Sequence, residues 1–77
     1  MAEYKINFMW DSEAYVWVAT SDDVQGLALE HGSLDALMER VKYAVPELLE
    51  LNEQLPPIDD IALLYNTFRS ERLVLNG

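Results

Sequence analysis

The stretch "WVATSDDVQGLALEHGSLDAL" (residues 17–37) decides the fold, because its hydrophobic pattern changes from the period of a strand to that of a helix. Its first five residues close a strand that is rich in β-branched and aromatic side chains. "DDVQG" then interrupts that strand, since aspartate is disfavoured in strands and Gly26 can adopt a positive φ. "LALEH" resumes as a short strand, and Ser33 is a favourable helix N-cap.

Upstream, the segment "EYKINFMW" (residues 3–10) alternates with a period of two, which predicts a strand with one buried face. One face carries Tyr4, Ile6, Phe8 and Trp10, and the other carries Lys5, Asn7 and Met9. A second strand over residues 15–21 follows a short polar connection. The two strands are therefore expected to form an antiparallel hairpin, and residues 27–31 to complete a three-stranded meander.

Downstream of Ser33, leucine and valine recur at helical spacing. Pro46 either kinks this helix or opens a second short helix as its first residue. Residues 53–60 are predicted to be a loop and residues 61–68 a strand, with "RLVL" (residues 72–75) either continuing that strand past a bulge or folding back. The sequence thus predicts one α+β domain over residues 1–77: a two-layer fold with an antiparallel meander, one kinked helix and a further strand.

The charge balance narrows the classes of partner. Five basic against fourteen acidic residues give a net charge of −9, which disfavours direct binding to a phosphate backbone. The same charge suits a basic protein partner, although it also serves solubility alone. The sequence has no cysteine and no apolar run long enough to span a membrane, so a soluble cytoplasmic protein is expected.

A catalytic site is disfavoured, and no catalytic residue or cofactor is expected. The alternative is a divalent-metal nuclease that uses Asp11, Asp22, Asp23 and Glu30, since carboxylates are the ligands of Mg²⁺ and Mn²⁺. Adjacent aspartates in an extended chain point in opposite directions, however, so Asp22 and Asp23 are interpreted as a solvated turn and not as metal ligands. His31, the only histidine, is expected near the helix entry.

One helix can cover only one side of the predicted sheet, yet the strands carry apolar residues on both sides. The uncovered side is therefore predicted to bind another protein or a second copy of this chain, which makes a homo-oligomer such as a dimer an expectation. Binding, and not catalysis, is the function that the residues favour.

The run "WDSEAYVWVATSDDVQGLALE…SLDALMERVK…VPELLELN" resembles the HicB-like family of antitoxin domains, in its short branch of unknown function. The likeness is carried by a first strand that ends in Trp10–Asp11, by "VWVATSDDVxGL" and by "VPELLE" late in the helix, and it covers residues 4–52. It implies a partly degenerate ribonuclease H-like fold. It also implies a role as an antitoxin that binds a small basic RNA-cleaving toxin of the HicA type and blocks its active surface.

This sequence departs from the family pattern in three ways. Full HicB antitoxins continue into a DNA-binding domain, and operator binding is not expected here. The family commonly has proline where this chain has Gln25, and Asn7 and Phe8 stand where ribonuclease H enzymes carry a catalytic aspartate. The resemblance thus supports binding without nuclease activity. The residues predicted to contact the partner are Asp22, Asp23, Val24, Gly26, Trp10 and Trp17.

Overall fold

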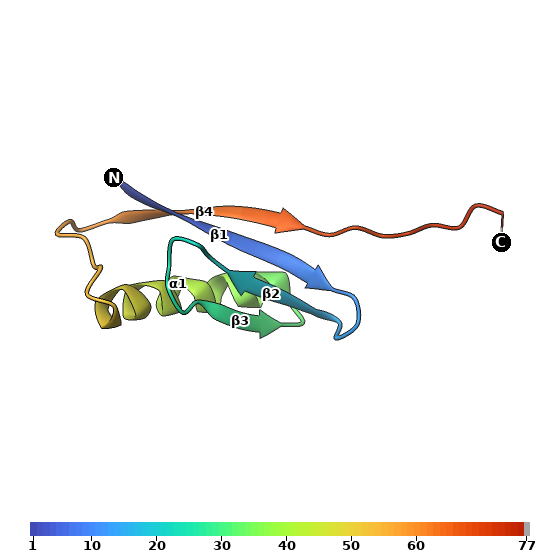
Figure 1. Cartoon of the computed structure of the whole chain (residues 1–77), viewed down its shortest axis with the longest axis horizontal. Coiled ribbons are helices and arrows are strands. Elements are labelled where there is room, and N and C mark those ends of the chain that lie inside the picture. Colours follow the sequence, from blue (N-terminus) through green and yellow to red (C-terminus); the bar gives the residue numbers. More distant parts are fainter. Residues whose placement is uncertain (77) are drawn as a thin grey trace.

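A computed structural model describes residues 1–76 and confirms the predicted order of elements. These are β1 (Ala2–Asp11), β2 (Val16–Thr20), β3 (Ala28–His31), α1 (Leu34–Leu51) and β4 (Ile61–Phe68). The β1–β2 hairpin and the short third strand are present as expected. The fold is α+β, with one helix against one four-stranded sheet (Figure 1).

The strands lie in the order β3-β2-β1-β4, so the first strand of the chain is internal and the last is at an edge. β1 pairs antiparallel with β2, and β2 pairs antiparallel with β3. β4 instead pairs parallel with β1 over eight residues, from Ala2 opposite Ile61 to Met9 opposite Phe68. The parallel direction follows from the long crossover through α1, which carries the chain from one edge of the sheet to the other.

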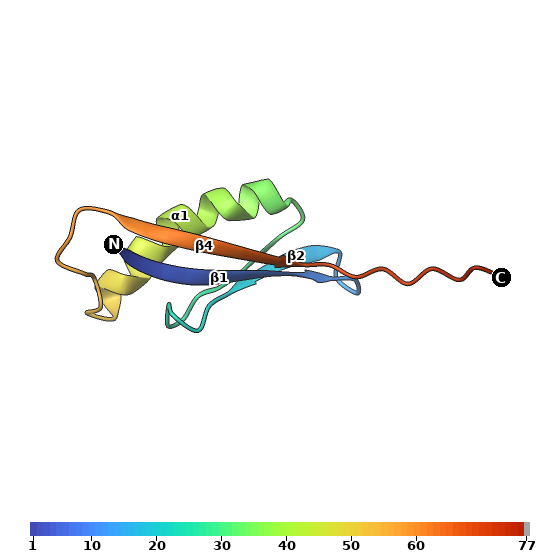
Figure 2. The same ribbon diagram turned by 90° about the horizontal axis from the view of Figure 1, so that it is seen from above.

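α1 covers one face of the sheet and leaves the other face uncovered within the described part of the chain (Figure 2). The covered face holds the core, in which the side chain of Phe8 is fully buried and meets Tyr65 edge to face at 5.0 Å between ring centroids. Burial of these apolar side chains is the main favourable term in folding. The fully or almost fully buried core residues are Ile6, Phe8, Ala19, Val24, Leu27, Leu37, Val41, Val45 and Leu49.

α1 begins as predicted and passes through Pro46 as one helix. The side chain of Ser33 accepts a hydrogen bond from the backbone N–H of Ala36 at 3.2 Å. The alternative of a second helix that begins at Pro46 is wrong, because α1 runs without interruption to Leu51. The helix ends where Glu53 adopts a φ of 55° and the N–H of Gln54 bonds the carbonyl of Leu49 at 2.8 Å, the usual geometry of a Schellman motif.

The prediction for residues 72–75 is wrong in both its forms. This segment neither continues β4 as a strand nor folds back on it; residues 69–76 lead away from the sheet as an extended tail (Figures 1 and 2). The physical reason lies in β1, which ends at Asp11 and so offers no backbone partner to the chain beyond the first residues of the tail. We refer to residues 69–76 as the tail.

Candidate protein-binding surface

The uncovered face of the sheet carries a row of apolar side chains. Met9 lies opposite Val18 of β2 and opposite Phe68 of β4 in the strand register, so the three side chains cross three strands side by side. Met9 and Phe68 are each 55% exposed and Val18 is half-buried. We call Val18, Met9 and Phe68 the open-face row. It is the apolar surface that the sequence predicted on the side opposite α1.

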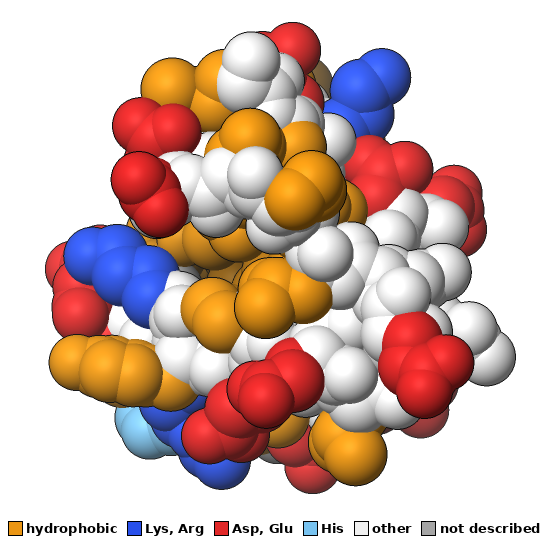
Figure 3. Space-filling model, turned by 90° about the vertical axis from the view of Figure 1, so that its left-hand side faces the viewer, with side chains coloured by type: hydrophobic (Ala, Val, Ile, Leu, Met, Phe, Trp, Pro, Cys, Tyr) orange, Lys and Arg blue, Asp and Glu red, His pale blue; other side chains and the backbone are white. Residues whose placement is uncertain are grey.

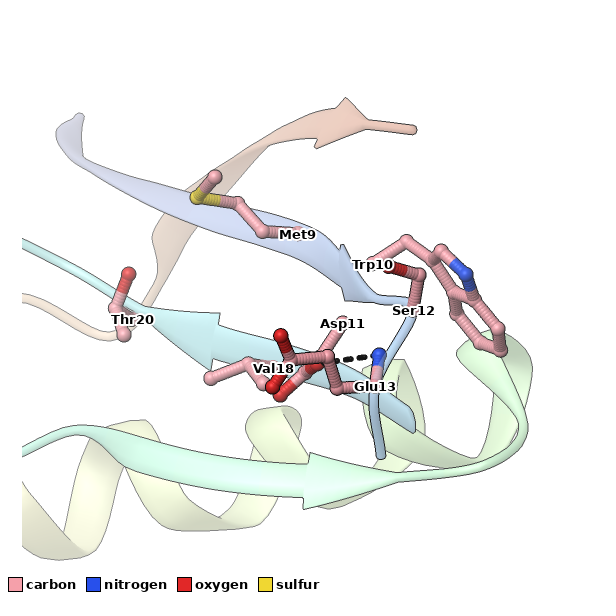
Figure 4. Close-up of a pocket in the computed structure, with 7 residues that line it drawn as sticks. All are labelled: Met9, Trp10, Asp11, Ser12, Glu13, Val18 and Thr20. Carbon is pink, nitrogen blue, oxygen red and sulfur yellow. Dashed lines mark hydrogen bonds between the residues drawn. The ribbon is translucent and has the colours of Figure 1, made fainter. Parts of the chain in front are cut away.

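A hollow of about 400 Å³ adjoins the open-face row at the β1–β2 hairpin (Figure 4). Met9 and Val18 contribute apolar groups to it, and Asp11 and Glu13 contribute carboxylates. The Oδ1 atom of Asp11 accepts hydrogen bonds from the backbone N–H groups of Glu13, at 3.0 Å, and Ala14, at 3.2 Å, which fixes the hairpin turn. A hollow lined by apolar groups and by carboxylates suits a side chain with a long aliphatic stem and a positive end.

The two predicted tryptophans belong to the other side of the sheet. Trp17 packs against the core, and its ring lies 5.5 Å from that of Trp10. The guanidinium carbon of Arg69 lies 4.2 Å from the centre of the Trp10 ring, a cation–π contact. Figure 4 shows the Trp10 ring extending towards the β3–α1 connection, away from the side on which Met9 lies. Trp10 and Trp17 are therefore placed to hold the start of the tail. Trp10 also lines the hollow beside Met9, so its contact with a partner stays a prediction.

The turn after β2 is tied to β1 by its own polar side chains. The hydroxyl of Ser21 donates to the carbonyl of Lys5 at 2.6 Å and accepts from the backbone N–H groups of Asp23 and Val24. The carboxylate of Asp23 accepts from the backbone N–H of Lys5 at 2.7 Å. These bonds satisfy the backbone of β1 just beyond the point where its pairing with β2 ends. Asp23 thus has a structural role in this turn.

Three other predicted residues of this turn differ in their accessibility. Val24 is wholly buried in the core, so its prediction as a partner contact is wrong; an apolar residue at a turn here anchors the turn to the protein interior. Gly26 is exposed and has a φ of 86°, a conformation that favours glycine. Asp22 is exposed, as the interpretation of a solvated turn requires.

The four carboxylates of the nuclease alternative are not brought together. Asp11 pairs with Val16 at one end of β2, whereas Asp22 and Asp23 follow the other end, about 15 Å or more away along an extended chain. Glu30 lies opposite Val18 on β3. Among residues 1–76 no group of three or more histidine, cysteine, aspartate or glutamate side chains is arranged to hold a metal ion. The Nδ1 atom of His31 accepts the backbone N–H of Ser33 at 2.9 Å, a local bond at the helix entry.

A second hollow, of about 510 Å³, lies at the C-terminal end of α1 and is lined by Glu47, Glu50, Leu51 and Glu53. The last turn of α1 contains no basic residue, so these carboxylates add to the negative end of the helix dipole. Figure 3 views this end of the molecule and shows red carboxylates spread around orange apolar groups, with few blue basic groups. The acidic character predicted from composition is therefore expressed on the surface.

The sequence pattern placed Met9 on the face of β1 opposite Phe8, but Met9 was not among the predicted partner contacts. Val18 and Phe68 were not predicted as contacts either. Alternation in residues 3–10 contains the signal for Met9. Val18 and Phe68 could be found only from the register, because their neighbourhood depends on pairing between distant strands.

No helix within the described residues has both the length and the apolar character that a membrane span requires.

Comparison with known proteins places this fold in a family. No curated protein matches the chain. A solved structure that is similar to it is the crystal structure of the hypothetical protein TTHA1013 from the extremely thermophilic bacterium Thermus thermophilus. The two share 39% sequence identity with a TM-score of 0.79, over 92% of this chain and 99% of that one. The family model for a domain of unknown function, DUF1902, matches residues 3–76, and the chain therefore belongs to the DUF1902 family.

Proposed function

We propose that this domain is a non-catalytic protein-binding module whose binding surface is the open face of the sheet. The observation that carries the proposal is the open-face row, in which Val18, Met9 and Phe68 lie side by side on the face that α1 does not cover. Apolar rows of this kind lose contact with water when a partner packs on them, and that loss favours association.

The charge supports a basic partner. The net charge of −9 creates a field that attracts a positively charged protein and raises its association rate. Asp11 and Glu13 line the adjoining hollow together with Met9 and Val18, and so offer carboxylates beside the apolar row. A basic protein that presents lysine or arginine around an apolar centre would match both features.

In its specific form the proposal is that the domain acts as an antitoxin and neutralises a small basic RNA-cleaving toxin. What supports this form is the HicB-like pattern of residues 4–52 together with the acidic charge. An acidic module seated on the cationic surface with which a toxin binds RNA would compete with the phosphate backbone for that surface.

The test uses the products of the open reading frames that flank this gene. We expect one of them to be a short basic protein that stops growth when expressed alone, and we expect growth to return when this domain is co-expressed. Met9→Asp should abolish the rescue and weaken binding in calorimetry by roughly tenfold or more, because it places a charge at the centre of the apolar surface. Leu51→Asp, at an exposed leucine on the end of α1, is the matched control and should bind like the wild type.

Two results would contradict the proposal in different ways. If no flanking product binds the domain, the antitoxin role is refuted. If one binds and Met9→Asp binds equally well, the partner uses another surface and the open face is not the binding site. A steep loss of association rate between low and high salt would support the part assigned to charge.

A further inference from the structure

The two edges of the sheet are protected to different degrees. β3 is only four residues long and carries Glu30 and His31, features that discourage pairing with another strand. β4 is eight residues long, "IALLYNTF", with no charge and no proline. Within residues 1–76 its outer side has no strand partner, since β4 is the last strand in the sheet order. A long uncharged apolar edge is a site where another strand adds.

The tail that follows β4 is exposed as well. Leu73, Val74 and Leu75 are 79%, 70% and 88% exposed, and they form three consecutive apolar residues outside the body of the domain. Figures 1 and 2 show that the tail runs on in the direction of β4 and not back towards its edge. Residues 69–75 contain no glycine, proline or asparagine that would favour a tight reversal onto the same β4.

We propose that two copies of this chain pair through their β4 edges, antiparallel about a two-fold axis at Phe68, so that each tail lies along the partner's β4. One copy then supplies the strand that the other copy's edge lacks. This arrangement continues the sheet across both copies and places both helices on the same face, because the two-fold axis is perpendicular to the sheet. The proposal does not depend on the antitoxin role.

The register follows from the side chains. With the axis at Phe68, Leu73 lies opposite the partner's Leu63 and Leu75 opposite the partner's Ile61. Val74 lies opposite the partner's Ala62, so all three apolar tail residues meet apolar residues.

Neighbouring registers are less favourable. An axis at Thr67 would place Val74 opposite the partner's Asp60 and Leu75 opposite the partner's Asp59, so two of the apolar tail residues would meet carboxylates. An axis at Arg69 would place the two Arg69 side chains opposite each other, and like charges in that position are destabilising.

Charge complementarity favours a second copy as the occupant. Residues 69–77 hold two of the five basic residues of the chain, Arg69 and Arg72, but only one of its fourteen acidic residues, Glu71. The tail of one copy is therefore attracted to the acidic body of the other. The axis also brings Phe68 beside the partner's Phe68, which joins the two open-face rows into one row across the dimer.

Sedimentation velocity and cross-linking test the proposal on the full chain. We expect wild-type protein to sediment at low micromolar concentration as a dimer of the 8.8 kDa chain, and Leu73→Asp/Leu75→Asp to sediment as a monomer. Both residues are exposed outside the core, so this variant should keep the far-ultraviolet circular dichroism of the wild type. Met9→Asp, the variant that tests the open face, should remain a dimer.

Cysteine variants test the axis, because the chain has no cysteine of its own. Phe68→Cys should oxidise to a covalent dimer, since directly opposite residues of paired strands are close enough for a disulfide. Glu30→Cys, on the other edge strand, should stay uncross-linked. A monomeric wild type, or a dimer that survives Leu73→Asp/Leu75→Asp, would overturn the proposal. A dimer in which Phe68→Cys fails to cross-link would overturn the axis at Phe68.

Discussion

Phe8 and Met9 are adjacent in β1 and are similar in size and hydrophobicity, yet they occupy opposite environments. Phe8 is 0% exposed under α1, whereas Met9 on the other face is 55% exposed. The difference separates two uses of the same strand. Its covered face supplies the free energy of folding, and its open face remains available for contact with another protein.

The largest expected effect contrasts these two neighbours directly. Phe8→Ala should lower the free energy of unfolding by about 3–5 kcal/mol, because it opens a cavity in the core. Met9→Ala should change it by less than about 0.5 kcal/mol, as is usual for a surface position. Chemical denaturation of both variants measures this difference. A Met9→Ala variant as unstable as Phe8→Ala would show that the open face is part of the folding core.

The next-largest loss of stability is expected in the turn that follows β2. Ser21→Ala removes the hydroxyl that bonds the carbonyl of Lys5 and the N–H groups of Asp23 and Val24. It should lower the free energy of unfolding by about 1–3 kcal/mol. Asp22→Asn, next to it and exposed, should be neutral within about 0.5 kcal/mol. Thermal denaturation of the pair decides whether this turn is held by Ser21 or only by the burial of Val24.

A smaller effect is expected at Gly26. Its φ of 86° is unfavourable for any side chain, so Gly26→Ala should destabilise the domain by about 1–2 kcal/mol. An added Cβ would lie 3.5 Å from a methyl group of Leu48, an ordinary contact, so the loss is conformational and not steric. Gly32 does not have a positive φ, so Gly32→Ala is the control and should lower the free energy of unfolding by less than Gly26→Ala does. Equal stabilities of both variants would contradict this assignment.

The smallest effect appears only in alkali. Partial burial raises the pKa of Tyr65, with an opposing contribution from Lys42. Its folded pKa lies above the unfolded value of about 10, so the neutral ring is favoured in the fold; the stabilisation is complete below pH 10 and is lost as the pH rises through the folded pKa. Tyr65→Phe should therefore lose less stability above pH 10 than the wild type in denaturant titrations at stepped pH. Parallel pH profiles of the two proteins would contradict it.

Much of the fold was predictable because it is encoded locally. Alternation in residues 3–10, the break at "DDVQG" and the cap at Ser33 identified three strands and the helix start. Pro46 left two alternatives, and packing decided between them, since Val45 and Leu49 on either side of it are both buried in the core. The low helix propensity of proline alone does not predict that the helix continues, because the outcome depends on tertiary packing.

The binding surface was predictable in kind but not in its residues. The apolar residues on both sides of the predicted strands indicated an open apolar face, but Val18, Met9 and Phe68 become neighbours only through the pairing of β1 with β2 and with β4. Trp10 and Trp17 were predicted as partner contacts, whereas in the structure Trp17 packs against the core and the Trp10 ring holds Arg69. The tail does not form a strand because β1 ends at Asp11 and offers no backbone partner beyond the first residues of the tail.

The parallel pairing of β1 with β4 has a consequence for how the chain is made on the ribosome. β1 is synthesised first, but one of its two edges stays without a partner until Ile61–Phe68 has been added. At about 5–20 residues per second, the roughly 50 residues between these strands take about 3–10 s to translate. During that interval the nascent hairpin of β1 and β2 presents a bare apolar edge, and chaperones are expected to meet the protein there before any partner does.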